Sequence, residues 1–574
     1  MVILGLSGAV SHDPAAALFI DGQLVAAAEE ERFVRQKHAK DKMPYEAVKY
    51  CLDFAGIEPA AVQYVAFPYA RISLKRPDRW HYARRHWYAP DRALTAIFNG
   101  NRRFRRNLRR SYKLINDLKI GGDKLRFYPI EHHIAHVSSA YHLSGFRGKC
   151  ALISIDGKGE YATAFFGYAE AGKIHKIKEF YDPDSLGGFY GAMTEYLGFE
   201  MLDGEFKVMG MAPYGDPNRF DFSRLINYSA SDFRINTRLV NVIGSRRYRE
   251  NGKSFYFSPE LVRWLGPRRR NDEIDDPYVD YAAAVQQLLE KVVLGLVDNY
   301  LGHIIKETGK ICYAGGVALN VKLNQKIMTM DGVKELFVQP AASDAGTAIG
   351  AASYVASLMG DELQRLEHVY LGPSYSTEEC IAACQQHEKR PVWERLADPP
   401  KTAAGLLAAG NPVAWFQGRM EFGPRALGNR SILGDPSWPG IADRINAQIK
   451  YRERWRPFCP SILDRSALEI IKTDHPSPFM TFTFDVADSW KARIPEVVHE
   501  DGTARAQVVD RQTNPRYYRL IEELEKLRGI PVVLNTSLNR RGEPMVCSPV
   551  DALEMFFGSN LEYLVMEDIL VRKN

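Results

Sequence analysis

Two histidines spaced four residues apart raise the question of metal chemistry. The segment 131–142 reads EHHIAHVSSAYH, and in a helix His132 and His136 would project from the same face. Two such imidazoles can share one metal ion when further ligands come from elsewhere in the chain. Taken alone, the pair favours the ordinary alternative, in which one ring packs or caps and the other faces water. A third ligand therefore has to be found.

Two carboxylates that follow strand-like segments are candidates. ALISI ends at Asp156-Gly157, a corner that can place an acidic group near phosphates. LFVQPAASDAGTAIGAA carries Asp344 ahead of a helix of small residues, and two histidines with a carboxylate leave positions open for a substrate oxygen. In KICYAGGVALN, Gly316 follows a strand and Asn320 lies one turn later. This pattern is a weak indication of phosphate or ribose binding.

A second group of candidates is cationic and lies in the last third of the chain. Its members are Arg419, Arg425, Lys450, Arg456 and Arg505, beside a polar corner at Asn535-Thr536-Ser537. Few acidic residues occur in the same motifs to neutralise them. Guanidinium and ammonium groups at such density predict a site for a small phosphorylated compound and a nucleotide phosphate.

A third group lies between residues 71 and 110, where arginine alternates with Trp, Tyr and Phe. Such a patch suits the phosphate groups of a nucleic acid, a lipid surface or an anionic glycan. The alternative is a solvated helical insertion that docks through its aromatic side chains. The sequence favours neither over the other.

The elements that must position these groups belong to a large protein. A chain of 574 residues is too long for one core, so two or more domains are expected. Hydrophobic residues make up 45% and charged residues 25%, which is typical of a soluble protein. The seven cysteines form no CxxC pair, which argues against a disulfide framework or a zinc ribbon. Neither a signal peptide nor a membrane span is recognisable, so the cytoplasm is the expected compartment.

The pattern of short strands occurs twice. VILGLSG, AALFI and QLVAAAEE are joined by tight turns, and the same plan returns with ALISI, YATAFFGYAEA and IHKIKEF. A meander that opens each half of a chain is typical of the actin–hexokinase type of fold. The composition then shifts near residues 360–400, and a new α/β pattern follows. We therefore expect an α/β protein with a two-lobed actin-like domain at 1–360, an insertion at about 71–116, and a second α/β domain at 370–574.

Ten motifs in one order extend this interpretation. They are EEERFVRQKH, HHIAH, DGKGE, GEFKVMGMAPYG, AGGVALN, SDAGTAIGAA, GPRALGNRS, WRPFCPS, DGTARAQ and NTSLNRRGEP. In type and order they resemble the O-carbamoyltransferases of the nodulation-factor and antibiotic-tailoring type. The resemblance covers essentially the whole chain except the basic insertion. It implies that the C-terminal domain is similar to the threonylcarbamoyl-adenylate synthases (YrdC-like).

The resemblance also implies an activity in two steps. The C-terminal domain would combine carbamoyl phosphate with ATP, accompanied by Mg²⁺, into carbamoyl-adenylate. The N-terminal domain would pass the carbamoyl group to a hydroxyl, with a divalent metal that is usually Fe²⁺, while Mn²⁺ and Zn²⁺ remain open. An enclosed path between the two sites would keep water from the labile mixed anhydride.

Carried over position by position, the resemblance implies roles for particular residues. The implied metal ligands are His132, His136, Asp156 and Asp344, and the implied general base is His12. The implied adenylate-binding positions are Lys37, Gly316 and Asn320. The implied carbamoyl phosphate positions are Arg425, Lys450, Arg456, Arg505, Asn535 and Ser537.

The acceptor is less well indicated. Residues that hold an aminoglycoside in the antibiotic enzymes have no evident counterparts, so another acceptor is expected. A hydroxyl of a glycan or natural product, such as a phosphorylated core sugar of lipopolysaccharide, would suit the basic insertion. No nucleic acid is expected as a partner. Contact with a membrane or a lipid-linked substrate, and a homodimer, are left open.

Three alternatives compete with this prediction. A hydrogenase-maturation carbamoyltransferase would need an acylphosphatase module and paired CxxC zinc fingers, which the sequence does not contain. A threonylcarbamoylation enzyme would use the basic insertion to contact transfer RNA. A non-catalytic nucleotide- or glycan-binding protein is disfavoured because both sites keep their polar side chains.

Overall fold

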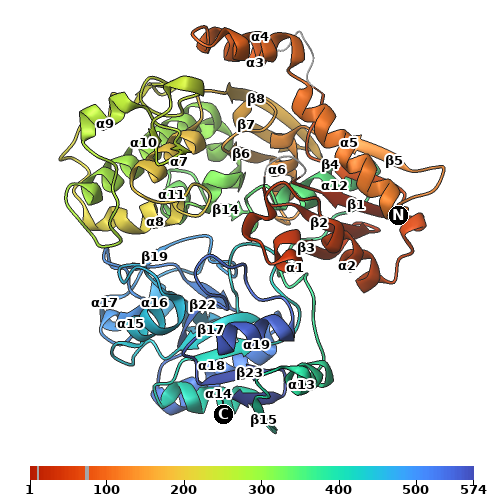
Figure 1. Cartoon of the computed structure of the whole chain (residues 1–574), viewed down its shortest axis with the longest axis vertical. Helices are drawn as coiled ribbons and strands as arrows, with labels where there is room; N and C mark the ends of the chain where they lie inside the picture. The colour runs from red at the N-terminus through yellow and green to blue at the C-terminus, as the bar shows by residue number, and fades with distance from the viewer. Residues whose placement is uncertain (9–11, 72–76, 574) are drawn as a thin grey trace. The chain divides into compact units, whose positions relative to one another are not determined.

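The computed structural model of the protein describes residues 1–8, 12–71 and 77–573 (Figure 1). The chain forms two compact units. Unit 1 comprises Met1–Val25, Asp41–Tyr45 and Leu52–Arg365. Unit 2 comprises Ala26–Lys40, Glu46–Cys51 and Leu366–Asn574. The functional division at 1–360 and 370–574 stays a prediction.

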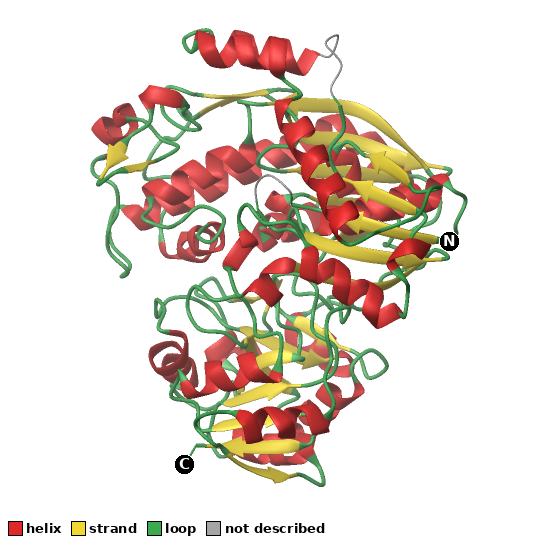
Figure 2. Cartoon of the chain, turned by 45° about the vertical axis from the view of Figure 1, so that its right-hand side comes forward, coloured by secondary structure: helices red, strands yellow, loops and turns green. Residues whose placement is uncertain are grey.

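Unit 1 begins with a five-stranded sheet in the order β3-β2-β1-β4-β5. The strands of the chain are drawn in yellow in Figure 2. Its strands are β1 (Val2–Leu6), β2 (Ala15–Ile20), β3 (Gln23–Glu29), β4 (Tyr64–Phe67) and β5 (Arg126–Pro129). β1 pairs antiparallel with β2, whereas β4 and β5 extend the sheet in parallel. The turn between β2 and β3 consists of Asp21 and Gly22, both at positive φ, as a tight hairpin turn requires.

The second sheet of unit 1 repeats this plan in the order β14-β13-β6-β7-β8. Its strands are β6 (Cys150–Ile155), β7 (Ala162–Glu170), β8 (Lys173–Tyr181), β13 (Lys310–Ala314) and β14 (Glu335–Val338). Again an antiparallel meander is followed by two strands added in parallel. Two sheets with one topology make the actin–hexokinase fold, and the α/β prediction is confirmed.

Small residues pack two helices closely together beside the sheets. α6 (His132–Tyr141) and α12 (Gly346–Leu358) approach so closely that a Cβ on Gly350 would lie 1.7 Å from the carbonyl oxygen of Ala135. A Cβ on Gly5 of β1 would likewise meet Ala348 at 2.0 Å. Only glycine permits such approaches without displacing the backbone. They fix α12 firmly against α6 and β1.

The basic insertion is helical. It contains α3 (Pro77–Arg85), α4 (Pro90–Asn99) and α5 (Arg102–Asp117), drawn in orange in Figure 1. Residues 72–76 lie outside the described part of the chain. α3 is anchored because His81 and Arg85 both contact the buried carboxylate of Asp184 at 2.9 Å. Trp80, Trp87 and other large apolar side chains of the insertion are exposed.

Unit 2 contains an eight-stranded mixed sheet in the order β15-β24-β23-β16-β17-β22-β18-β21. The strands are β15 (Val392–Arg395), β16 (Val413–Phe416), β17 (Arg430–Gly434), β18 (Cys459–Leu463), β21 (Gln507–Val509), β22 (Val532–Ser537), β23 (Tyr563–Met566) and β24 (Ile569–Arg572). α14 (Pro399–Ala408) and α18 (Pro515–Arg528) supply apolar side chains to its core.

An N-terminal segment also belongs to unit 2. α1 (Glu30–Val34) carries Arg32, whose guanidinium donates to the carbonyl of Gly423 at 2.8 Å. Arg35 donates to the carbonyls of Pro544 and Met545. Among the described helices of both units, none is long and apolar enough to cross a bilayer.

Candidate functional site

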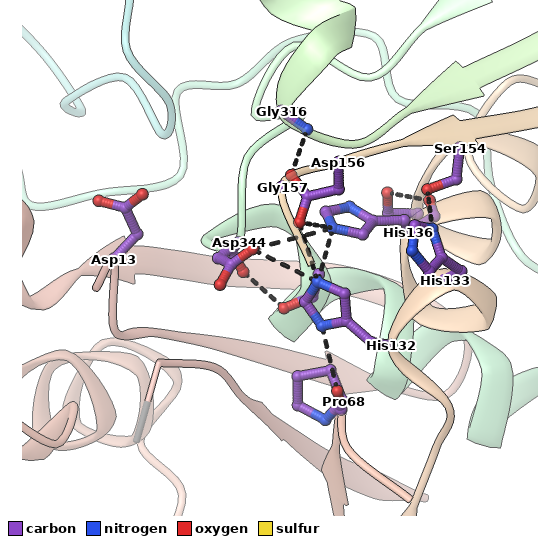
Figure 3. A network of polar contacts seen from close by, with 12 residues as sticks. Asp13, Pro68, His132, His133, His136, Ser154, Asp156, Gly157, Gly316 and Asp344 are labelled. Atoms are coloured by element: carbon purple, nitrogen blue, oxygen red, sulfur yellow. Dashed lines mark hydrogen bonds and ion pairs between the residues drawn. The ribbon is translucent and has the colours of Figure 1, made fainter. Parts of the chain in front are cut away.

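The histidine pair lies on a buried helix of unit 1. All ten residues of α6 are buried, and the Nε2 atoms of His132 and His136 face each other at 3.1 Å (Figure 3). His133 points elsewhere, because its Nδ1 lies 2.8 Å from the hydroxyl of Ser154. The helix predicted from the spacing is present, and it brings together the two imidazoles that were expected to meet.

Two carboxylates complete the cluster. Asp156 follows β6 and Asp344 follows β14, and the carboxyl ends of these parallel strands meet at one edge of the sheet. The Nε2 atom of His132 is 3.4 Å from an oxygen of each carboxylate, and that of His136 is 3.9 Å from the same oxygens. All four donor atoms lie within 4.8 Å of one another. We call these four residues the ligand quartet.

The quartet fits a metal ion. Ligands bound at about 2.1 Å in a tetrahedron would lie about 3.4 Å apart, close to the separations present. The other ring nitrogen of His132 is held by the carbonyl oxygen of Pro68 at 3.3 Å. A backbone carbonyl in this position orients a metal-binding imidazole and fixes its tautomer.

Without an ion, the quartet distributes protons unevenly. Burial lowers the pKa of His132, but the charges of Tyr69 and Asp344 and the hydrogen bond to Asp156 outweigh it, so this pKa is raised. Burial and the neighbouring His132 lower the pKa of His136 to about 3. Burial raises the pKa of Asp156, yet the two histidines bring it below its usual range. The two carboxylates therefore favour a positive charge on the imidazole of His132.

His12 lies in the same unit. Its Nδ1 is 3.1 Å from the carboxylate of Asp13. Burial lowers the pKa of His12, but the hydrogen bond to Asp13 and the charges of Asp344 and Asp156 raise it to about 9. These carboxylate charges link His12 electrostatically to the quartet.

The glycine-rich corner of unit 1 is partly occupied by internal contacts. The amide of Gly316 donates to Asp156 at 2.9 Å, which fixes one quartet carboxylate. Asn320 caps α11 (Val321–Met328) through its side-chain oxygen and pairs with Gln286. Lys37, the third expected adenylate position, belongs to unit 2 instead. The structure therefore does not gather these three residues in one unit.

In unit 2 the expected cations come together around a polar corner. Lys450 ends a π-helical turn, Asn446–Lys450, and its ammonium donates to the carbonyls of Ser537 and Asn539 at 2.8 and 2.9 Å. The pKa of Lys450 is well below its usual range because the group is buried beside Arg452, Arg456 and Lys37.

The arginines crowd one another as well. Burial and the charges of Arg505 and Arg456 lower the pKa of Arg425, and burial also lowers that of Arg456. Asn535 is buried, and its amide donates to the carbonyl of Ala426 at 3.2 Å. Lys450, Arg425, Arg456 and Arg505, with Arg452, form what we call the cation cluster. Arg419 donates to the carbonyl of Leu371 at 2.6 Å.

Sequence reasoning missed two members of this region, Arg452 and Glu453. Burial and Arg456 lower the pKa of Arg452, and one of its guanidinium nitrogens is buried without a hydrogen-bond partner. Glu453 is buried and lies 3.5 Å from Arg456. The signal was present in YRERWRP, where Arg452 and Glu453 stand between the expected Lys450 and Arg456.

Comparison with protein families covers parts of both units. A family model described as the carbamoyltransferase N-terminus matches residues 2–353, and one described as the carbamoyltransferase C-terminus matches residues 404–573. The chain belongs to the carbamoyltransferase family. It is therefore an enzyme that transfers a carbamoyl group, and the alternative of a non-catalytic binding protein is rejected.

Individual carbamoyltransferase relatives extend over most of the chain. Nodulation protein NolNO of Sinorhizobium fredii is 35% identical, over all of this chain and 83% of its own length. Nodulation protein NolO of Bradyrhizobium diazoefficiens is 38% identical over 77% of this chain and 79% of its own. The uncharacterized protein sll1178 of Synechocystis sp. is 36% identical, over all of this chain and 96% of its own.

Solved structures resemble the carbamoyltransferase more distantly. HypF of T. kodakarensis is 11% identical with a TM-score of 0.31, over 63% of this chain and 48% of that one. MreB 5 of Spiroplasma citri is 10% identical with a TM-score of 0.30, over 62% of this chain and 96% of that one. The fold assignment accordingly rests on the two repeated sheets and not on these scores.

Proposed function

We propose that the enzyme forms carbamoyl-adenylate from carbamoyl phosphate and ATP in unit 2 and transfers the carbamoyl group to a hydroxyl in unit 1. The observation that carries this proposal is the contrast between two buried clusters. Unit 2 concentrates cations that lower one another's pKa, whereas unit 1 holds four metal-type ligands within 4.8 Å. One cluster suits anionic phosphates and the other suits a divalent cation.

In the first half-reaction, water cleaves the carbamoyl phosphate to carbamate and phosphate. The carbamate oxygen then attacks the α-phosphorus of ATP, and pyrophosphate leaves. The cation cluster would bind the phosphates and neutralise the charge that develops on them. Asn535 and Ser537 supply hydrogen bonds at the corner where Lys450 is anchored.

In the second half-reaction, the acceptor oxygen attacks the carbamoyl carbon, the bond to the adenylate oxygen breaks, and AMP leaves. We assign the general-base role to His12, whose Nδ1 contacts Asp13. Because its pKa is raised to about 9, only the deprotonated form of this imidazole takes the hydroxyl proton, and transfer should therefore be faster at alkaline than at neutral pH. A divalent ion held by the quartet would polarise the carbamoyl carbonyl or neutralise the leaving phosphate. Fe²⁺, Mn²⁺ and Zn²⁺ all suit two nitrogen and two oxygen ligands, and ATP would bring Mg²⁺.

The acceptor class that we favour is a small molecule or glycan with a reactive hydroxyl. Relatives named as nodulation proteins support a biosynthetic acceptor of this kind. A phosphorylated or lipid-linked sugar, such as a lipopolysaccharide core sugar, remains our more specific suggestion, supported by the basic helices α3–α5.

The test separates the half-reactions. Purified enzyme is incubated with ATP and carbamoyl phosphate, and pyrophosphate release is measured in the wild type, Arg456→Ala and His136→Ala. Arg456→Ala is expected to lower the release by at least about 100-fold, because it removes a charge from the phosphate site. His136→Ala is expected to retain it, yet to form no carbamate in a pool of glycans analysed by mass spectrometry.

The contrary results are equally clear. Wild-type pyrophosphate release by Arg456→Ala would place the first reaction elsewhere. Release by the wild type only with threonine and bicarbonate would instead select a threonylcarbamoylation enzyme.

A further inference from the structure

A cavity of about 400 Å³ lies in unit 1, between the insertion and a short hairpin of the main domain. α3 and α4 contribute Tyr82 and Arg92 to its wall. The hairpin of β11 (Arg249–Glu250) and β12 (Lys253–Ser254), with the segment before it, contributes Arg247, Arg249 and Ser254. The quartet residues do not line this cavity.

The wall of the cavity carries a strong excess of positive charge. Three arginines line it, and among the described residues of its lining none is acidic. Arg249 and Ser254 are direct partners across the β11–β12 pair, so a guanidinium and a hydroxyl stand side by side. Arg92 lies 3.6 Å from Asp91, but both side chains are largely exposed, so this pair neutralises little.

One of the arginines is held in place before any ligand binds. The Nε of Arg247 donates to the carbonyl of Val242 at 2.8 Å, and its guanidinium stacks 3.6 Å from the ring centroid of Tyr256. A guanidinium fixed through Nε and its face keeps its two terminal nitrogens for a second partner. Such a planar fork matches the oxygens of a phosphate.

The cavity is connected to the quartet through a short loop. Tyr82 packs against Tyr161 with ring centroids 5.5 Å apart, and the ammonium of Lys158 lies 4.9 Å from the Tyr82 ring. Lys158 is two residues from Asp156. The insertion also starts beside the quartet, since Tyr69 stacks on His132 at 4.9 Å. Contacts between neighbouring side chains therefore link the wall of the cavity to residues close to the quartet.

We propose that this cavity binds the phosphate of a phosphorylated glycan acceptor, away from the hydroxyl that is carbamoylated. This inference rests on the proposed function for the identity of the reaction, although the anion site itself does not. Three guanidinium groups and a hydroxyl favour an anionic phosphate over a neutral sugar, which has no charge to pair with the arginines. α3 is fixed on Asp184, so the insertion presents a preformed wall to an acceptor.

The experiment compares two variants that lose the same charge. Arg92→Ala/Arg249→Ala removes two exposed arginines from the cavity, and Arg102→Ala/Arg109→Ala removes two exposed arginines from α5. All are made in an Arg456→Ala background to weaken phosphate binding in unit 2. Calorimetric titration with glucose 6-phosphate, inorganic phosphate and glucose gives the affinities. Crystals soaked in tungstate locate the anion by anomalous scattering.

The cavity variant is expected to lose at least tenfold in affinity for glucose 6-phosphate, and the α5 variant less than about twofold. Glucose 6-phosphate binding more tightly than inorganic phosphate supports a glycan phosphate, whereas equal affinity overturns that part in favour of free phosphate. Equal loss in both variants, or no tungstate in the cavity, overturns the site. If wild-type enzyme releases no pyrophosphate while the cavity binds glucose 6-phosphate, the proposed function fails and the anion site stands.

Discussion

The ligand quartet and the cation cluster are both buried and charged, yet they differ in the signs of the charges that lie side by side. In the quartet, groups of opposite sign lie near one another, so the carboxylates hold a proton on His132 while His136 stays neutral. In the cation cluster, five cationic side chains crowd together and lower one another's pKa, and Glu453 beside Arg456 neutralises part of their charge. The first arrangement stabilises a cation that replaces a proton, and the second is stabilised when an anion binds.

The largest effect is expected from breaking the quartet. His132→Ala/Asp344→Ala removes one nitrogen and one oxygen ligand, so the purified protein should lose nearly all bound metal. Since such an ion contributes several kcal/mol to transition-state stabilisation, carbamate formation should fall by at least about 10³-fold. Metal content by plasma mass spectrometry and carbamate by liquid chromatography with mass detection check this.

A matched control uses the third histidine of the helix. His133→Asn removes an imidazole whose Nδ1 hydrogen-bonds to Ser154 and which is not one of the four quartet ligands, so its metal content should equal that of the wild type. Full metal content in the His132→Ala/Asp344→Ala protein would contradict the assignment of the quartet.

An intermediate effect is expected in the cation cluster. Arg452 has a buried guanidinium nitrogen without a partner, whereas Arg454 is exposed and pairs with Asp443 at 2.7 Å. Arg452→Ala should raise the KM for carbamoyl phosphate by about 10- to 100-fold, because a charge-assisted hydrogen bond is worth about 1.5–3 kcal/mol. Arg454→Ala should leave it within about twofold. Steady-state pyrophosphate release gives both values, and equal KM values would show that Arg452 does not face the substrate.

Much of the architecture could be predicted from the sequence because its signals are local. The two meanders follow from alternating apolar residues and Asp-Gly turns, and the helical spacing of His132 and His136 places both rings on one face. The cavity could not be predicted in this way. Arg92 lies in the basic patch, but Arg249 is far from it in the chain and lies in no motif. Contacts of Arg85 with Asp184 and of Arg246 with Tyr88 hold the insertion near the hairpin.

Other details depend on which polar side chains already form hydrogen bonds within the protein. Asn320 looked available for a nucleotide, yet it caps α11 and pairs with Gln286. Lys37 was grouped with the first domain by its position, but α1 and the residues after it belong to unit 2. A polar residue type in a motif indicates chemistry, whereas its hydrogen-bond partners decide how much of that chemistry remains for a ligand.

The smallest effect is expected on the surface of α5, where charge is present without a built site. Four arginines of α5 are exposed: Arg102, Arg103, Arg105 and Arg106. Water and dissolved salt therefore screen their attraction for an anionic acceptor. Charge reversal of all four to Glu should weaken glucose 6-phosphate binding about threefold at low salt. The difference should disappear near 0.5 M salt, because the screening length is already about 10 Å at 0.1 M. Calorimetry at both salt concentrations measures this affinity. The cavity variant is the comparison, because its loss of affinity for glucose 6-phosphate should remain when salt is added. A loss in the α5 variant that persists at high salt would mean that α5 binds the phosphate directly. No loss at either concentration would leave α5 as a structural or membrane-facing surface.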